Sequence, residues 1–266
     1  FRRVLFRSKG DKITYTLTIE NPYDVEREIV VTDNLPDQVK ADGKYTVNGV
    51  EQDQAWNGSY EGTIEANGEL VIEIPVVVVE SFDETNSEVN VIGNQASLKA
   101  KDVLTGEDGE DTPTEEVTHY ITPKVSYTMN KVRVTEPKEG LKGFVAGAGE
   151  VIEYKVTFKN TGDLGLDINL NDVFKESDYF TFVEASEASI RLEKDETETV
   201  IFKATVNEGT PASDDKGYLN TVTSEGTATY TDPKSGNDVT INKTTQEDLE
   251  QTSTANTPVI EVKDPT

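Results

Sequence analysis

Cysteine is absent from this chain of 266 residues, and histidine, methionine and tryptophan each occur once. Without cysteine there are no disulfides, cysteine-bound zinc sites or catalytic thiols, and a histidine-based triad or metal site would depend on His119 alone. Basic residues are scarce too: 25 Lys and Arg against 51 Asp and Glu give a net charge of -26, which repels phosphate. We therefore expect a protein without enzymatic activity, metal, cofactor or nucleic-acid partner.

Long apolar runs are also missing. The longest, residues 74–79, contains Pro75 and is far too short to cross a bilayer, so no membrane span is expected. Hydrophobic residues make up 34% of the chain, but many are β-branched and regularly spaced, which is not typical of a disordered acidic chain. The composition indicates a folded protein rich in strands.

The sequence repeats itself. A first set of residues recurs at an offset of 139, and Asn90 recurs as Asn220 at an offset of 130, so the first copy is expected to be nine residues longer in its middle. Such a repeat indicates homologous modules, each of about 125 residues. The pairs at the first offset are Gly10/Gly149, Ile13/Ile152, Tyr15/Tyr154, Asn21/Asn160 and Asp33/Asp172.

Within each copy, apolar and polar residues alternate. Residues 13–19 and 152–158 show this period of two, which is typical of strands with one buried face. Turn-forming pairs such as Asn21-Pro22 and Asn67-Gly68 separate the runs. The fold class expected is all-β, with two tandem immunoglobulin-like β-sandwich domains.

Composition also suggests boundaries. Three arginines among the first eight residues are foreign to this acidic chain and occupy the place of the first strand of copy one, which indicates a non-native leader. The acidic segments 105–118 and 247–256 resemble linkers, and each is followed closely by Thr-Pro. We expect a leader at 1–8, repeat 1 without its first strand at 9–118, repeat 2 at 119–246, and a linker with the start of a third repeat at 247–266.

Three polar residues of repeat 2 interrupt apolar stripes. Lys131 continues the face of Tyr127 and Met129, Asp172 follows Ile168 and Leu170 on one face, and Asn220 lies between Tyr218 and Val222. Strand alternation therefore directs an amine, a carboxyl and an amide into one core. Burial of unpaired charges costs several kcal/mol (about 3 to 5).

Two interpretations follow. In the first, Lys131 and Asp172 form a buried ion pair with Asn220 as a hydrogen-bonding neighbour, or a β-bulge moves Lys131 to an edge. In the second, burial keeps the amine and the acid neutral, so that Lys131 is a nucleophile and Asp172 polarises the Asn220 amide and relays protons. Loss of ammonia would then leave a Lys131–Asn220 isopeptide bond.

The strings GDKITYTLTIEN at residues 10–21 and VVTDNLP at residues 30–36, together with NTVT at residues 220–223, resemble the repeat domains of Gram-positive surface adhesins and backbone pilins. The resemblance implies an immunoglobulin-like fold, a place on the cell surface or cell wall outside the cell, and, in some members, an isopeptide bond. Carried onto this chain, it implies Lys131 and Asn220 as the joined residues and Asp172 as the autocatalytic proton relay.

The two copies depart from that pattern differently. Repeat 2 has Leu170-Asn171-Asp172-Val173-Phe174 in place of a TDTLP-like stretch. In repeat 1 the acid and amide equivalents are Asp33 and Asn90, with Asn94 competing for the amide role, and no lysine is visible at the position equivalent to Lys131.

Two other clusters suggest ligands. Acidic residues 107, 108, 110 and 111 offer oxygens for calcium, although a solvated linker has the same composition. Tyr45, Trp56 and Tyr60 would suit a sugar platform, or equally a packed core.

The function expected is that of a stalk or spacer in a bacterial cell-surface adhesin. Its partners would be neighbouring repeats of the same chain, with any host or matrix ligand bound by other domains. The alternative is a ligand-binding or carbohydrate-binding adhesin module, which would expose an aromatic or apolar patch around residues 45–60.

Overall fold

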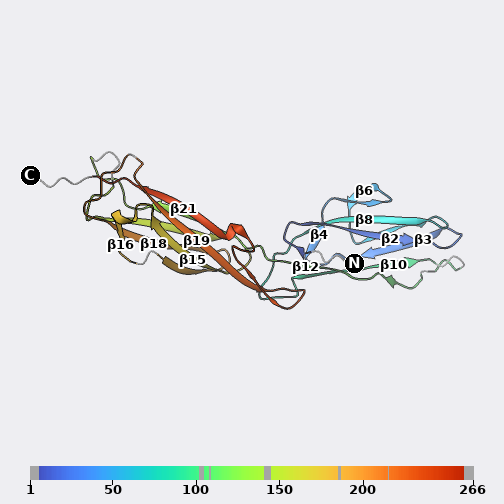
Figure 1. Ribbon diagram of the computed structural model, residues 1–266. Coiled ribbons are helices and arrows are strands. Elements are labelled where there is room, and N and C mark those ends of the chain that lie inside the picture. Colours follow the sequence, from blue (N-terminus) through green and yellow to red (C-terminus); the bar gives the residue numbers. More distant parts are fainter. Residues whose placement is uncertain are drawn as a thin grey trace, which may run out of the picture. The chain divides into compact units, whose positions relative to one another are not determined.

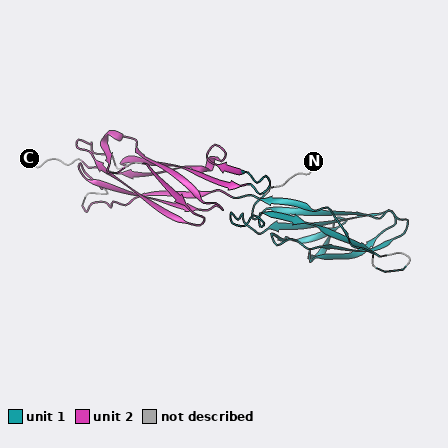
Figure 2. Ribbon diagram, turned by 90° about the horizontal axis from the view of Figure 1, so that it is seen from below, with its two compact units in different colours: residues 1–123, 232–237 teal, residues 124–231, 238–266 magenta. Residues whose placement is uncertain are grey.

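A computed structural model describes residues 6–101, 105–107, 109–140, 145–184, 187–214 and 216–260 of the chain. In these ranges the regular structure consists of strands and two short 3₁₀ turns, Ser177–Tyr179 and Glu247–Leu249. The all-β prediction is confirmed. No helix in the described ranges is long and apolar enough to span a membrane. The chain divides into two compact units (Figure 2): unit 1 comprises residues 1–123 and 232–237, and unit 2 comprises residues 124–231 and 238–266.

Unit 1 has three sheets, several of whose strands are labelled in Figure 1, and their strand pairs are antiparallel except for β1 with β12. One sheet has the order β2-β8-β5-β6 with β4 beside β8, a second has the order β11-β10-β3-β7, and a third has the order β1-β12-β9. The strands are β1 (Phe6–Arg7), β2 (Lys12–Glu20), β3 (Arg27–Asp33), β4 (Val39–Ala41), β5 (Lys44–Val47), β6 (Val50–Ala55), β7 (Ser59–Ile64), β8 (Glu69–Val78), β9 (Val91–Asn94), β10 (Ala96–Ala100), β11 (Thr112–Pro113) and β12 (Val117–Ile121).

Unit 2 consists of two sheets. One has the order β13-β14-β18-β16, and the other has the order β17-β15-β19-β20 with β21 paired to β19. The strands are β13 (Tyr127–Arg133), β14 (Val151–Asn160), β15 (Leu166–Phe174), β16 (Phe180–Phe182), β17 (Glu187–Leu192), β18 (Thr197–Val206), β19 (Tyr218–Thr231), β20 (Asp238–Ile241) and β21 (Glu250–Thr257).

Alternation places the core as the sequence predicts. In β14 every second residue from Ile152 to Phe158 is buried, and β15 buries the alternate residues from Leu166 onwards. The polar residues between them face outward, so each strand contributes one apolar face to the sandwich. Burial of these faces is the main favourable contribution to folding of the unit.

The pairing registers of the two units establish which residues correspond. Asp33 lies opposite Ala96, and Asp172 lies opposite Val222. The residue two positions earlier on the late strand is Asn94 in unit 1 and Asn220 in unit 2. The predicted match of Asn90 with Asn220 is therefore wrong, and Asn94 is the equivalent. Sequence alternation failed to separate them because residues four apart on a strand share one face.

This register also changes the predicted length difference. Asn94 and Asn220 are 126 residues apart, whereas Asp33 and Asp172 are 139 apart, so unit 1 is longer by 13 residues and not by nine. Most of the extra length forms the hairpin of β5 and β6.

The predicted boundaries also need correction. β12 belongs to unit 1, so a boundary between residues 118 and 119 would cut a strand. β21 pairs with β19 from Tyr218 to Glu225, so residues 250–257 of the segment predicted as a linker and third repeat form a strand of unit 2. Its side chains are polar and largely exposed, because it lies at the edge of the sheet, and this made it resemble a linker. Residues 261–266 lie outside the described ranges.

The predicted leader contributes structure in part. Residues 1–5 lie outside the described ranges, and β1 pairs in parallel with β12 through Arg7 and Ile121. Unit 2 has the same parallel contact between Ala146 and Val259. β1 therefore corresponds to the segment that precedes β14. The expectation that it occupies the place of the first strand was wrong.

Candidate functional site

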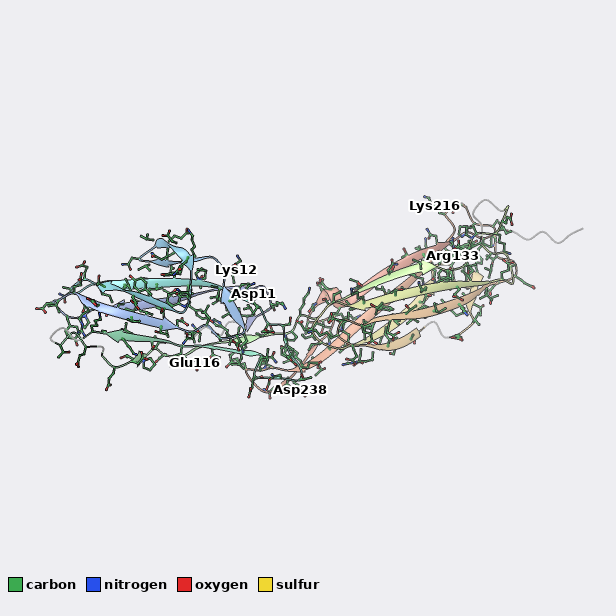
Figure 3. All side chains as sticks on the ribbon, turned by 180° about the vertical axis from the view of Figure 1, so that it is seen from behind. Asp11, Lys12, Glu116, Arg133, Lys216 and Asp238 are labelled. Atoms are coloured by element: carbon green, nitrogen blue, oxygen red, sulfur yellow. The ribbon has the colours of Figure 1, made fainter. Side chains whose placement is uncertain are left out.

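The candidate site lies in the core of unit 2, and β13 supplies its amine. β13 pairs with β14 along one edge, where Lys131 lies opposite Val156. On its other side β13 contacts β21, since the Lys131 amide donates to Ser253 Oγ at 3.0 Å. Arg133, labelled in Figure 3, extends this contact by donating from its guanidinium to the Asn256 carbonyl. The strand is thereby held between two neighbours, and its central lysine points inward.

Lys131 and Asp172 form an ion pair inside the sandwich. Lys131 Nζ donates to Asp172 Oδ1, and both side chains have 0% exposed area. The Lys131 ammonium lies 4.7 Å from the ring centroid of Tyr154 and 5.8 Å from that of Phe202. Aromatic faces attract a cation but offer it no hydrogen bonds, so Asp172 is the side chain that accepts a hydrogen bond from this amine.

Asn220 completes the group from β19. Its Nδ2 donates to the Val173 carbonyl at 3.0 Å, which orients the amide plane. Its Oδ1 is buried without a hydrogen-bond partner, and so is Asp172 Oδ2. A proton on Asp172 Oδ2 would provide the donor that Asn220 Oδ1 lacks. Unpartnered buried acceptors are uncommon in folded proteins, so the hydrogen bonding of the acid and the amide is incomplete at this site.

The protonation tendencies point the same way. Burial lowers the pKa of Lys131, against the opposing effect of Asp172. Burial raises the pKa of Asp172, against the opposing effects of Lys131 and of a weaker interaction with the Asn220 side chain. Desolvation thus favours a neutral amine beside a neutral acid, although their attraction favours the charged pair. A neutral amine is a nucleophile, and a neutral acid can polarise an amide.

Unit 1 keeps two of these three groups. Asp33 and Asn94 are buried, and Asn94 Nδ2 donates to Asp33 Oδ2 at 3.0 Å. Burial raises the pKa of Asp33, and the hydrogen bond from Asn94 opposes this shift. Within the described residues, no ion pair joins Asp33 to a basic side chain. Asn90, the other candidate, bonds instead to the backbone of Asp83 and stabilises a loop.

Sequence analysis missed a supporting pair of residues. The Tyr154 hydroxyl forms a hydrogen bond with Thr257 Oγ1, which closes the site on the side of β21. Register places His119 at the equivalent position of unit 1, where its ring lies 5.9 Å from that of Tyr15. Tyr15 and Tyr154 are visible as a repeated pair in the sequence, but their partners lie on strands that we had not recognised.

The structure also bears on the two other ligand hypotheses, a sugar platform and a calcium site. Tyr45 and Trp56 are buried and pack edge to face at 5.2 Å, and Trp56 Nε1 donates to the Asp33 carbonyl at 2.8 Å. These two rings therefore belong to the core of unit 1 and offer no platform for a sugar. Of the acidic cluster, Asp108 lies outside the described residues. The described residues contain no group of three or more acidic or histidine side chains placed to hold a metal ion.

The sequence matches no protein-family model and no curated protein. Among solved structures, the chain is similar to BcpA, the major pilin subunit of Bacillus cereus, with 12% identity, a TM-score of 0.37, and coverage of 97% of this chain and 66% of that one. It is also similar to the full-length major pilin SpaD from Corynebacterium diphtheriae, with 14% identity, a TM-score of 0.35, and coverage of 96% and 62%.

A third similar structure is the 35 kDa C-terminal fragment of the major pilin GBS80 of Streptococcus agalactiae, with 10% identity, a TM-score of 0.32, and coverage of 96% and 94%. The chain spans slightly less than two thirds of the lengths of BcpA and SpaD. At these values the function has to be inferred from the residues of the chain itself.

Proposed function

We propose that this protein is a structural spacer from a bacterial cell surface and that its second unit closes an internal isopeptide bond between Lys131 and Asn220. The observation that carries the proposal is the fully buried Lys131–Asp172 pair beside an amide whose oxygen has no partner. Stability alone does not account for a buried ion pair at this position, because apolar residues of similar volume fill such space without the free-energy penalty of desolvating two charges.

The reaction balances without any added reagent. The neutral Lys131 amine attacks Asn220 Cγ, while protonated Asp172 donates a hydrogen bond to Asn220 Oδ1 and stabilises the developing negative charge. A new Nζ–Cγ bond forms, the Cγ–Nδ2 bond breaks, and Asp172 passes a proton from the attacking nitrogen to the leaving one. Ammonia is the only product released, and each chain reacts once.

The bond would join β13, which opens unit 2, to β19 near its end. Force applied along the chain could then not peel β13 from the sandwich, and the closed loop would restrict the unfolded chain as a disulfide does. A chain with no cysteine would gain from such a crosslink in an extracellular setting. These features favour a passive load-bearing role over enzymatic activity.

Intact-mass measurement of the denatured protein tests the proposal. The wild-type chain should be lighter than its sequence mass by one ammonia, and Lys131→Ala and Lys131→Arg should show their full sequence masses. Lys155→Ala, which removes an exposed lysine from the neighbouring strand β14, should keep the deficit. A wild-type mass equal to the sequence mass would contradict the bond.

A further inference from the structure

Three Asn-Gly pairs occur in the chain, and all of them lie in turns or connections of unit 1. In such a pair the backbone nitrogen of the glycine can attack the side-chain Cγ of the asparagine, because glycine has no Cβ to obstruct the approach. The two groups are neighbours in one chain, so the attack is intramolecular. Hydrogen bonds that hold either group decide how fast it proceeds. The pairs are Asn48-Gly49, Asn57-Gly58 and Asn67-Gly68.

Hydrogen bonds hold two of the three pairs. Asn48 lies in the turn between β5 and β6, where its Oδ1 accepts from the Val71 amide at 2.8 Å and its own amide donates to the Val71 carbonyl at 2.8 Å. In the turn before β8, the attacking nitrogen of Gly68 itself donates to the Glu65 carbonyl at 3.0 Å. Attack in either pair requires such a bond to break first.

Asn57 has no such restraint. It is exposed in the connection between β6 and β7, and in the described part of the chain its side chain forms no hydrogen bond. The Asp33 amide donates to the Gly58 carbonyl at 3.0 Å, and in a regular antiparallel pair the Gly58 amide would donate back to the Asp33 carbonyl. That carbonyl accepts from Trp56 Nε1 at 2.8 Å instead. Among the described residues, the Gly58 N–H is left without an acceptor.

The surroundings of Gly58 are also open. Its φ of 108° lies in the region that favours glycine. The nearest atom to the place that a Cβ would take is Asn34 Oδ1, at an ordinary contact distance of 3.6 Å. Ring closure at Asn57 therefore breaks no hydrogen bond of the amide or of the attacking nitrogen and displaces no neighbour.

We propose that Asn57 is a site of spontaneous deamidation, and that hydrogen bonds protect Asn48 and Asn67 from the same reaction. The Gly58 nitrogen forms a bond with Asn57 Cγ, the Cγ–Nδ2 bond breaks, and the proton of Gly58 leaves with Nδ2 as ammonia. Water then opens the succinimide at either of its carbonyls. One opening leaves an aspartate, and the other leaves an isoaspartate, in which the backbone runs through the former side chain.

The isoaspartate would disturb the backbone contacts of Asp33. It adds one carbon to the backbone between Trp56 and Gly58, and both of these residues bond to the Asp33 backbone. An ordinary aspartate at position 57 adds a charge but no length. Trp56 is buried and is the single tryptophan, so its fluorescence distinguishes the two products.

Peptide mapping of the whole chain during incubation in mildly alkaline buffer tests the proposal. Cleavage after glutamate separates the three pairs, because Glu51 and Glu61 lie between them. The Asn57 peptide should convert to the acid first, with isoaspartate among its products. The other two should convert at least about fivefold more slowly, since a hydrogen bond of about 1 kcal/mol must break before the attack. An Asn57 peptide that stays unconverted, or that converts no faster than the others, would overturn the inference.

Two controls link the rates to the structure. In denaturant the three asparagines should convert at similar rates, because the protecting hydrogen bonds are lost, and a difference as large as in the folded chain would contradict the proposed protection. Trp56 emission should move to longer wavelength as isoaspartate accumulates, whereas Asn57→Asp should leave it in place. An equal shift in Asn57→Asp would contradict the role of the added carbon.

The proposal is independent of the crosslink in unit 2, although the succinimide and the crosslink each lack one ammonia. Asn57→Ala should abolish deamidation at this position and keep any deficit that arises from Lys131 and Asn220. Lys131→Ala should remove that deficit and leave the conversion rate of Asn57 unchanged. Loss of the wild-type deficit in Asn57→Ala would support the succinimide and refute the crosslink as its source.

Discussion

Units 1 and 2 have one scaffold and two different cores. Both bury an aspartate on the second long strand and an asparagine two residues before its pairing partner on the late strand. Unit 2 adds Lys131 from β13, whereas no ion pair joins the aspartate of unit 1 to a basic side chain among the described residues. The comparison indicates that the acid and amide belong to the scaffold of both units, while the amine determines whether the acid is paired.

The tyrosine at the edge of the site shows the same contrast. Tyr154 bonds to Thr257, while Tyr15 faces His119 without a hydrogen bond for its hydroxyl. Burial, with a contribution from Asp33, raises the pKa of Tyr15 to about 12, so the hydroxyl stays protonated. Unit 1 thus has a buried polar group without a partner where the equivalent group of unit 2 has one. Matched substitutions in the two units can measure what each group contributes to the free energy of unfolding.

Substitution of the two aspartates should give the largest difference. Asp172→Asn leaves the Lys131 ammonium buried without a counter-charge and should destabilise unit 2 by about 3 to 5 kcal/mol, besides preventing the crosslink. Asp33→Asn removes a buried carboxyl that forms no ion pair among the described residues, and the free energy of unfolding should change by no more than about 1 kcal/mol.

Denaturant unfolding measures both effects. Trp56, the single tryptophan, reports unit 1 by fluorescence, and circular dichroism reports the remaining transition. Asp167→Asn, on the exposed face of β15, is the control and should change little. Equal losses from Asp33→Asn and Asp172→Asn would refute the claimed difference between the cores.

Asn21, which follows β2, and Asn160, which ends β14, should give a smaller loss of stability, equal in the two units. Asn21 Nδ2 donates to the carbonyls of Val25 and Ile64, and Asn160 Nδ2 donates to those of Leu164 and Leu192. Asn21→Ala and Asn160→Ala should each cost about 2 kcal/mol, because buried carbonyls lose their donor.

The same two unfolding signals measure this pair. Asn171→Ala, at an exposed position of β15, is the control. If the losses of unfolding free energy differ by more than the error of the measurement, Asn21 and Asn160 do not have the same structural role in the two units.

The tyrosine hydroxyls should give the smallest difference. Tyr154→Phe removes the bond to Thr257 and should cost unit 2 about 1 kcal/mol, whereas Tyr15→Phe removes an unpartnered hydroxyl and should be neutral or slightly stabilising. Thermal unfolding followed by the signals described above compares them. A loss from Tyr15→Phe as large as that from Tyr154→Phe would mean that the Tyr15 hydroxyl is hydrogen-bonded in solution.

Much of this organisation follows from local pattern. Alternation in residues 152–158 predicts a half-buried strand, and the inward parity of Lys131, Asp172 and Asn220 agrees with their burial. Alternation cannot identify the register between strands, and this is why Asn90 was preferred to Asn94. Nor does it detect a polar edge strand such as β21, whose serines and threonines resemble a linker until the pairing with β19 is known.

The sequence by itself determined the strand character, the repeat, and the presence of an amine, an acid and an amide on inward faces, because these depend on residue type and on a period of two. Only the tertiary structure decided which asparagine lies beside which aspartate and that Lys131 contacts Asp172. Those facts depend on pairing between residues far apart in the chain, and such pairing is set by the packing of whole sheets.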